Sequence, residues 1–180
     1  MIKNDMEFLV RSEVRQRQQL RVRGAEGCWC ALCEADIVAF ALNQLPPRYC
    51  HAKNYGQAQS QDYGERVRSA VDRAVEKVGR RPKHRPGRPD RGTDARVLNY
   101  AQEIGDAIVG PLLAQREAAC ACLQCRADAL ALALNRYPPK YGVTAAGRES
   151  YQANFEDFIR HEMTQALARA AAEVGARPHH

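Results

Sequence analysis

The sequence is poor in lysine and has no long apolar run. Only five of its 27 basic residues are lysines, so 22 are arginines. No apolar stretch approaches the roughly 20 residues that cross a bilayer, and the charged N-terminal residues lack the apolar segment of a secretory signal. We therefore expect a cytoplasmic protein without a membrane partner, in which the seven cysteines are reduced.

The motifs of common enzyme classes are missing as well. The sequence contains no recognisable Ser-His-Asp set, no Walker loop and no site of two paired carboxylates. We therefore do not expect an enzyme. Segments that alternate apolar and polar residues, which are typical of half-buried strands, are also missing. This favours an all-α fold.

The net charge of +6 comes mainly from arginine. Arginine binds phosphates and guanine edges through two parallel hydrogen bonds, so the composition permits an anionic partner, although a GC-rich genome also enriches arginine. One cluster of cations contains Arg80, Arg81, Lys83, Arg85, Arg88 and Arg91. We interpret this cluster as a solvated tether, with nucleic-acid attraction as the less favoured alternative.

The chain is an internal duplication. Residues 28–49, CWCALCEADIVAFALNQLPPRY, return as residues 120–141, CACLQCRADALALALNRYPPKY, with 12 identities in 22 positions. Weaker matches align Asn4 with Asn99 and residues 78–82 with residues 174–178. Between the copies lies RRPKHRPGRPDRGTD, whose composition is typical of an exposed linker. We therefore divide the chain into a first half (1–82), a linker (83–94) and a second half (95–178).

The apolar residues of each half predict three helices. The first carries Ile2, Met6 and Leu9 on one face. The second starts at the cysteines and ends near Asn43, because the Pro-Pro pair that follows cannot continue a helix. The third covers about residues 63–78, and the second half repeats the pattern. Because each half alone would bury a thin core, we expect the halves to pack as a pseudo-two-fold intramolecular dimer.

These motifs resemble those of the ComFB family, the late competence development proteins. The family pattern KNxxE is present at residues 3–7 and CxCxxC at residues 28–33, and residues 36–49 match DxxALALNxLPPxY with Phe40 in place of its first leucine. The second half departs from KNxxE, with Leu98 in place of the lysine and Gln102 in place of the glutamate. The resemblance implies two tandem, small helical domains without enzymatic activity, whose cysteines can hold zinc.

Each copy of CxCxxC offers three thiols to a metal ion. These are Cys28, Cys30 and Cys33 in the first half and Cys120, Cys122 and Cys125 in the second. A structural zinc site needs four tetrahedral ligands, and Cys50, just past the Pro-Pro turn, is the expected fourth ligand in the first half. The second half has Gly142 there, so its set is incomplete unless His161 or Asp128 completes it. Alternatively, these cysteines are small buried apolar residues.

The resemblance also implies that some family members are receptors for cyclic di-GMP. The candidate ligand-binding residues come from KNxxE, from PPxY and from their repeats: Lys3, Asn4, Glu7, Arg48, Tyr49, Asn99, Lys140 and Tyr141. A cation beside an aromatic ring can bind a phosphate and stack on a base. The alternative is a buried tyrosine that fixes the turn. Because the second half lacks the lysine and the glutamate of KNxxE, we expect an asymmetric site.

Two further polar positions recur in the second helix of each half. Asp36 lies on an otherwise apolar face, so its carboxylate needs hydrogen-bond donors. We expect these donors to be the backbone amides of the CxCxxC loop, with a guanine edge of the ligand as the alternative. Asn43 and Asn135 precede Pro-Pro by three residues. We expect both to cap helix ends.

We therefore expect a non-enzymatic signalling protein that binds cyclic di-GMP and passes its state to a protein partner, in the control of motility, competence or surface behaviour. One alternative is a zinc-stabilised protein–protein interaction module without a nucleotide. Another is a nucleic-acid-associated competence factor. The terminal His179 and His180 are given no function.

Overall fold

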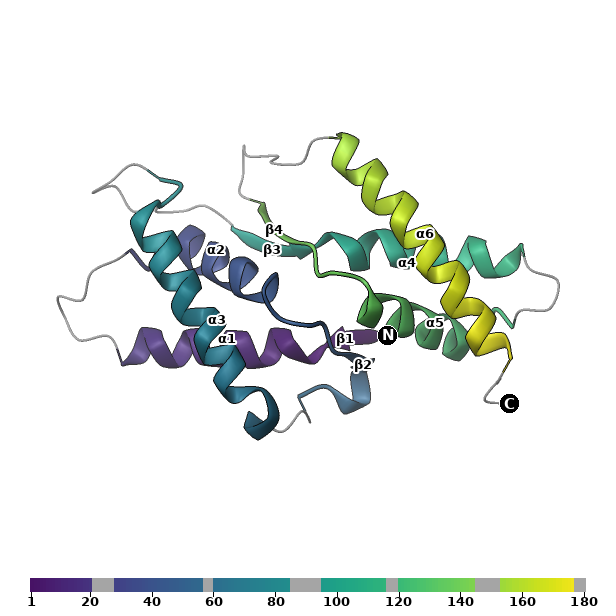
Figure 1. Cartoon of the computed structure of the whole chain (residues 1–180), viewed down its shortest axis with the longest axis horizontal. Coiled ribbons are helices and arrows are strands. Elements are labelled where there is room, and N and C mark those ends of the chain that lie inside the picture. The colour runs from purple at the N-terminus through teal and green to yellow at the C-terminus, as the bar shows by residue number, and fades with distance from the viewer. Residues whose placement is uncertain (21–27, 57–59, 85–94, 116–119, 145–152, 177–180) are drawn as a thin grey trace.

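The computed structural model describes residues 1–20, 28–56, 60–84, 95–115, 120–144 and 153–176. The elements of the first half are β1 (Ile2–Asn4), α1 (Asp5–Gln19), α2 (Ala31–Leu42), β2 (Tyr49–His51), the 3-10 turn η1 (Ala52–Asn54) and α3 (Ser60–Arg80). Those of the second half are β3 (Arg96–Asn99), α4 (Tyr100–Ala114), α5 (Leu123–Arg136), β4 (Tyr141–Thr144) and α6 (Ala153–Gly175) (Figure 1). The prediction of a mostly helical fold in two halves is confirmed. Within the described residues, no helix is long and apolar enough to cross a bilayer.

The helices begin and end where the sequence places strong local signals. Asn4 caps α1, because its Oδ1 accepts a hydrogen bond from the amide of Met6 at 3.1 Å. Asn99 caps α4 in the same way, through the amide of Gln102 at 3.2 Å. Helix α2 ends at Leu42, four residues before the Pro-Pro pair.

The expectation that the chain has no strands is wrong. Strand β1 pairs antiparallel with β2, with Lys3 opposite Cys50, and β3 pairs antiparallel with β4, with Val97 opposite Val143. Each strand has only three or four residues. An alternating pattern cannot be recognised over so short a stretch.

The strands pack against the helices of the opposite half. Ile2 and Tyr49, from β1 and β2, lie in the core formed by α4, α5 and α6. Tyr141 and Val143, from β4, lie in the core formed by α1, α2 and α3. Ile2 is therefore not part of the first helical face, where its spacing had placed it. The two halves interlock about a pseudo-two-fold axis by exchanging strands, and each core is completed by the other half.

The first two residues of the expected linker contact the first half. Lys83 forms an ion pair with Asp36 at 2.5 Å, and His84 contacts Cys33, so both residues lie against α2. The rest of the expected linker, residues 85–94, lies outside the described residues.

Candidate functional site

The asparagines that precede Pro-Pro hold the two halves together. Asn43 accepts a hydrogen bond from the amide of Tyr141 at 2.8 Å and donates one to its carbonyl oxygen at 2.9 Å. Asn135 makes the same pair of hydrogen bonds with the backbone of Tyr49. Neither asparagine has the left-handed backbone expected of a helix cap, because no residue other than glycine in the described part has a positive φ. Asn43 does occupy the C-cap position of α2, whereas Asn135 lies inside α5.

The two tyrosine hydroxyls meet in a polar network between the halves. The hydroxyl of Tyr141 accepts from Asn4 and from Asn99, both at 2.9 Å, and donates to Glu7 at 2.7 Å. Asn99 also donates to the hydroxyl of Tyr49. The KNxxE and PPxY motifs of both halves therefore converge at one place.

Burial keeps both phenols protonated. Burial raises the pKa of Tyr49 to about 12. Burial also raises the pKa of Tyr141, as do the charges of Tyr49 and Glu7 beside it. A neutral Tyr141 hydroxyl can donate to the Glu7 carboxylate, which is the arrangement observed.

This network changes the interpretation of half of the expected ligand-binding residues. Asn4, Tyr49 and Tyr141 are only 1%, 6% and 7% exposed, and Asn99 is half-buried with its amide bound to both phenols. The tyrosine rings are core residues and offer no open face for stacking on a base. The structure therefore favours the buried tyrosine that fixes the turn.

The remaining first-half candidates reach the surface beside aromatic rings. Lys3 lies with its Nζ 4.9 Å from the ring centroid of Tyr55, and Arg48 has its Cζ 5.3 Å from that of Tyr63. Phe8, 44% exposed, packs edge-on against Tyr55. We call these five residues the cation–aromatic surface.

Buried Asp5 connects the parts of this surface. Its carboxylate lies 3.8 Å from the Nε of Arg48 and accepts a hydrogen bond from the amide of Gly56. In the second half, Lys140 occupies the position of Arg48, and its carbonyl oxygen accepts from the amide of Tyr100 as that of Arg48 accepts from Asp5. The backbone frame is thus repeated in the second half.

The first-half cysteines form a four-ligand cluster with a histidine. Ligand atoms of Cys28, Cys30, Cys33 and His84 all lie within 4.8 Å of one another, and the Sγ of Cys33 is 3.2 Å from the Nε2 of His84. Zn–S bonds of about 2.3 Å in a tetrahedron place sulfurs about 3.8 Å apart, so this Cys₃His set fits zinc. Burial, together with the neighbouring thiols, raises the pKa of Cys33, and a bound cation would oppose this effect.

Cys50, the expected fourth ligand, is not part of this cluster. It lies in β2 opposite Lys3, near Asp5, and burial raises the pKa of its thiol. In the described residues, His84 and not Cys50 lies beside the three thiols. The counterpart of Cys50, Gly142, is a glycine for a steric reason, because an added Cβ would lie 2.5 Å from the ring of Tyr100.

The second-half cysteines form a three-ligand cluster in the described residues. Cys120, Cys122 and Cys125 have their sulfurs within 4.8 Å of one another. The amide of Cys125 donates to the sulfur of Cys122, which caps α5, and this lowers the pKa of the Cys122 thiol. Neither proposed substitute joins them: Asp128 pairs with His51 at 2.8 Å, and His161 contacts Gln165 on α6.

Sequence reasoning missed His84, although a signal was present. The motif Val-Gly-x-Arg-Pro-x-His occurs at residues 78–84 and again at residues 174–180, so the repeat aligns His84 with His180. His180 and His179 lie outside the described residues. Asp36 was also misassigned, since its partner is Lys83 and not the backbone of the cysteine loop.

Comparison with known proteins identifies the family. The family model for late competence development protein ComFB matches residues 3–82 and, a second time, residues 95–178. These matches cover most of the chain, which therefore belongs to the ComFB family and contains two tandem copies of its domain. Membership indicates a competence-related regulatory protein. Searches of curated proteins and of solved structures gave no match.

Proposed function

We propose that this chain is a non-enzymatic signalling protein that binds cyclic di-GMP through its first half. The cation–aromatic surface is the observation that carries the proposal. Lys3 and Arg48 each lie over an aromatic ring, and such pairs can bind a phosphate while a ring stacks on a guanine. Cyclic di-GMP offers two phosphates and two guanines.

The sequence of the second half supports a ligand site in the first half alone. Leu98 and Gln102 replace Lys3 and Glu7, so the second half lacks the lysine that lies over Tyr55 in the first half. In this proposal the second half completes the core beneath the surface, through β4 and the polar network. A structural change caused by ligand binding would then be transmitted through the interlocked halves to a protein partner.

Calorimetric titration of the full chain with cyclic di-GMP tests the proposal. Arg48→Ala should weaken binding by about 1–3 kcal/mol, the scale of a hydrogen bond to a charged group. Lys140→Ala, the matched variant in the second half, should have a smaller effect. Tyr49→Ala is unsuitable here, because the ring is a core residue. Absence of heat with the native protein would rule out the receptor proposal.

The second candidate is a zinc-stabilised interaction module without a nucleotide. The Cys₃His cluster favours it, because a closed set of four ligands is typical of structural zinc. The cluster ties α2 to the residues that follow α3, so a bound metal would stabilise the first half whether or not a ligand binds. We propose zinc as the cofactor under both candidates.

A further inference from the structure

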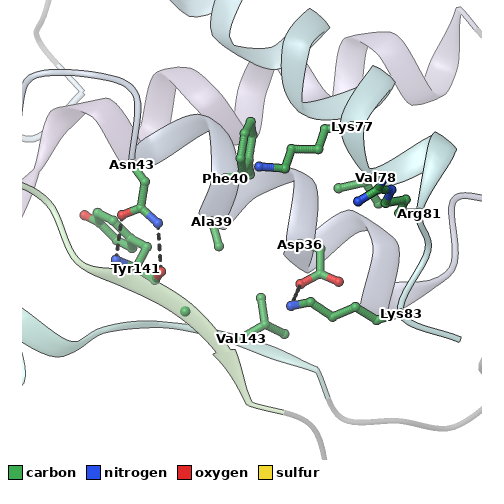
Figure 2. Close-up of a pocket in the computed structure, with 11 residues that line it drawn as sticks. Asp36, Ala39, Phe40, Asn43, Lys77, Val78, Arg81, Lys83, Tyr141 and Val143 are labelled. Carbon is green, nitrogen blue, oxygen red and sulfur yellow. Dashed lines mark hydrogen bonds and ion pairs between the residues drawn. The ribbon is translucent and has the colours of Figure 1, made fainter. Parts of the chain in front are cut away.

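A cavity lies at the opposite end of α3 from the cation–aromatic surface. It is bounded by α2, by the C-terminal end of α3 and by β4 from the other half, with a volume of about 240 Å³ (Figure 2). Tyr63 and Lys77 are fourteen residues apart on α3, which corresponds to about 21 Å along the helix axis. The cavity is therefore separate from the surface proposed for cyclic di-GMP.

The cavity combines three cations with one buried carboxylate. Lys77, Arg81 and Lys83 line it together with Asp36. Lys83 pairs with Asp36 at 2.5 Å, and the Nζ of Lys77 lies 4.1 Å from the ring centroid of Phe40 (Figure 2). One cation is balanced by the carboxylate, so two positive charges remain to attract an anion.

The rest of the lining is apolar. Ala39, Phe40 and Val78 come from the first half, and Val143 comes from β4. A cavity of this size takes a small ligand, since typical ligand pockets measure about 300–1,000 Å³. An ammonium and a guanidinium can donate together to the several oxygens of a phosphate. The apolar side chains would then cover a planar or apolar body attached to it.

The second half does not reproduce this lining. Glu173 stands where the repeat has Lys77, and it is paired with Arg136. His51 stands where the repeat has Val143, and its Nε2 lies 2.8 Å from Asp128, the counterpart of Asp36. At the position of Lys77 the second half therefore carries a carboxylate in place of an ammonium, and at the position of Val143 it carries an imidazole in place of an apolar side chain.

The Cys₃His cluster lies next to one wall of the cavity. Cys33 and Asp36 are one turn apart on α2, and they contact the adjacent residues His84 and Lys83. These two contacts fix the chain after α3 against α2. From this arrangement we propose that the cavity binds one mononucleotide-sized organic phosphate, with its phosphate at Lys77 and Arg81 and its ring between Phe40 and Val143.

Calorimetric titration of the full chain with guanosine monophosphate tests this site. Lys77→Glu copies the second half at an exposed position and should weaken binding at least tenfold. Arg169→Glu makes the same change of charge at an exposed position on α6, and it should leave binding unchanged. Val143→His copies His51 and should also weaken binding at least tenfold. Inorganic phosphate should bind at least tenfold more weakly than the nucleotide.

The outcomes separate this site from the cation–aromatic surface. Failure of the native protein to bind guanosine monophosphate, or equal effects of Lys77→Glu and Arg169→Glu, would overturn the assignment. Equal affinity for inorganic phosphate would overturn the role of the apolar wall. Arg48→Ala should leave guanosine monophosphate binding unchanged, so a loss of cyclic di-GMP binding in that variant concerns only the other surface.

Discussion

Asn43 and Asn135 serve the same purpose on opposite sides of the pseudo-two-fold axis. Each holds the backbone of a tyrosine from the other half by two hydrogen bonds, and each tyrosine hydroxyl then enters the shared polar network. The recurrence of asparagine and tyrosine in both copies is thus explained by contacts between the halves, without any ligand.

Replacing Asn43 by alanine should destabilise the protein. The variant loses two hydrogen bonds to the Tyr141 backbone, each of which contributes about 0.5–1.5 kcal/mol. We expect the free energy of unfolding, measured in urea, to fall by about 1–3 kcal/mol. Asn54→Ala, at an exposed position, should change it by less than about 0.5 kcal/mol. Similar losses of unfolding free energy in the two variants would show that the hydrogen bonds of Asn43 to the Tyr141 backbone do not stabilise the protein.

Tyr49 should make stability fall at high pH. Burial raises its pKa to about 12, whereas an unfolded tyrosine loses its proton near pH 10. The stability that this difference contributes is complete below about pH 10 and is lost as the pH rises towards about 12. Tyr49→Phe should therefore make the fall in unfolding free energy shallower, by up to about 1.4 kcal/mol per pH unit. Urea unfolding of both proteins at several pH values in this range measures how the unfolding free energy depends on pH. Identical slopes for wild type and Tyr49→Phe would contradict the prediction.

At the scale of elements, the sequence predicts the helices well and the strands not at all. Periodic apolar residues and the Pro-Pro pair mark the helices because these signals are local. The strand pairs join residues about 45 positions apart, such as Lys3 with Cys50 and Leu98 with Gly142. Their partners cannot be deduced from three or four residues. The position of Cys50 could not be deduced for the same reason, since it lies in β2 and not in the cluster.

His84, and not Cys50, should control metal binding in the first half. His84 lies within 4.8 Å of the three thiols, whereas Cys50 lies in β2. We expect His84→Ala to lower the zinc content of the purified protein and its melting temperature. Cys50→Ala should preserve the zinc content. Elemental analysis beside thermal unfolding measures both. Equal zinc content in wild type and His84→Ala, or loss of zinc in Cys50→Ala, would show that His84 is not the fourth zinc ligand.

At the scale of the whole molecule, the duplication has produced two halves that share a frame but differ in chemistry. Both halves contain an exchanged strand, an asparagine that binds a tyrosine backbone of the other half, and a cysteine cluster. Lys3, Arg48 and Lys77, which lie over aromatic rings, come from the first half, as do the three cations that line the cavity. The sequence revealed the missing lysine and glutamate of the second KNxxE. It could not reveal that His51 pairs with Asp128 and Glu173 with Arg136, since those contacts join distant elements.

The exchange of strands also predicts that the two halves unfold together. Val143 belongs to the second half but is 7% exposed within the core of the first, so neither core survives alone. We expect one calorimetric transition, with equal calorimetric and van't Hoff enthalpies. Val143→Ala should cost about 1–2 kcal/mol, because it removes two buried carbons, and should lower the single midpoint by about 2–4 °C per kcal/mol. Leu123→Ala, at a side chain that is 83% exposed, should leave the midpoint unchanged. Two separate transitions, or a Val143→Ala effect confined to one of them, would show that the halves are independent domains.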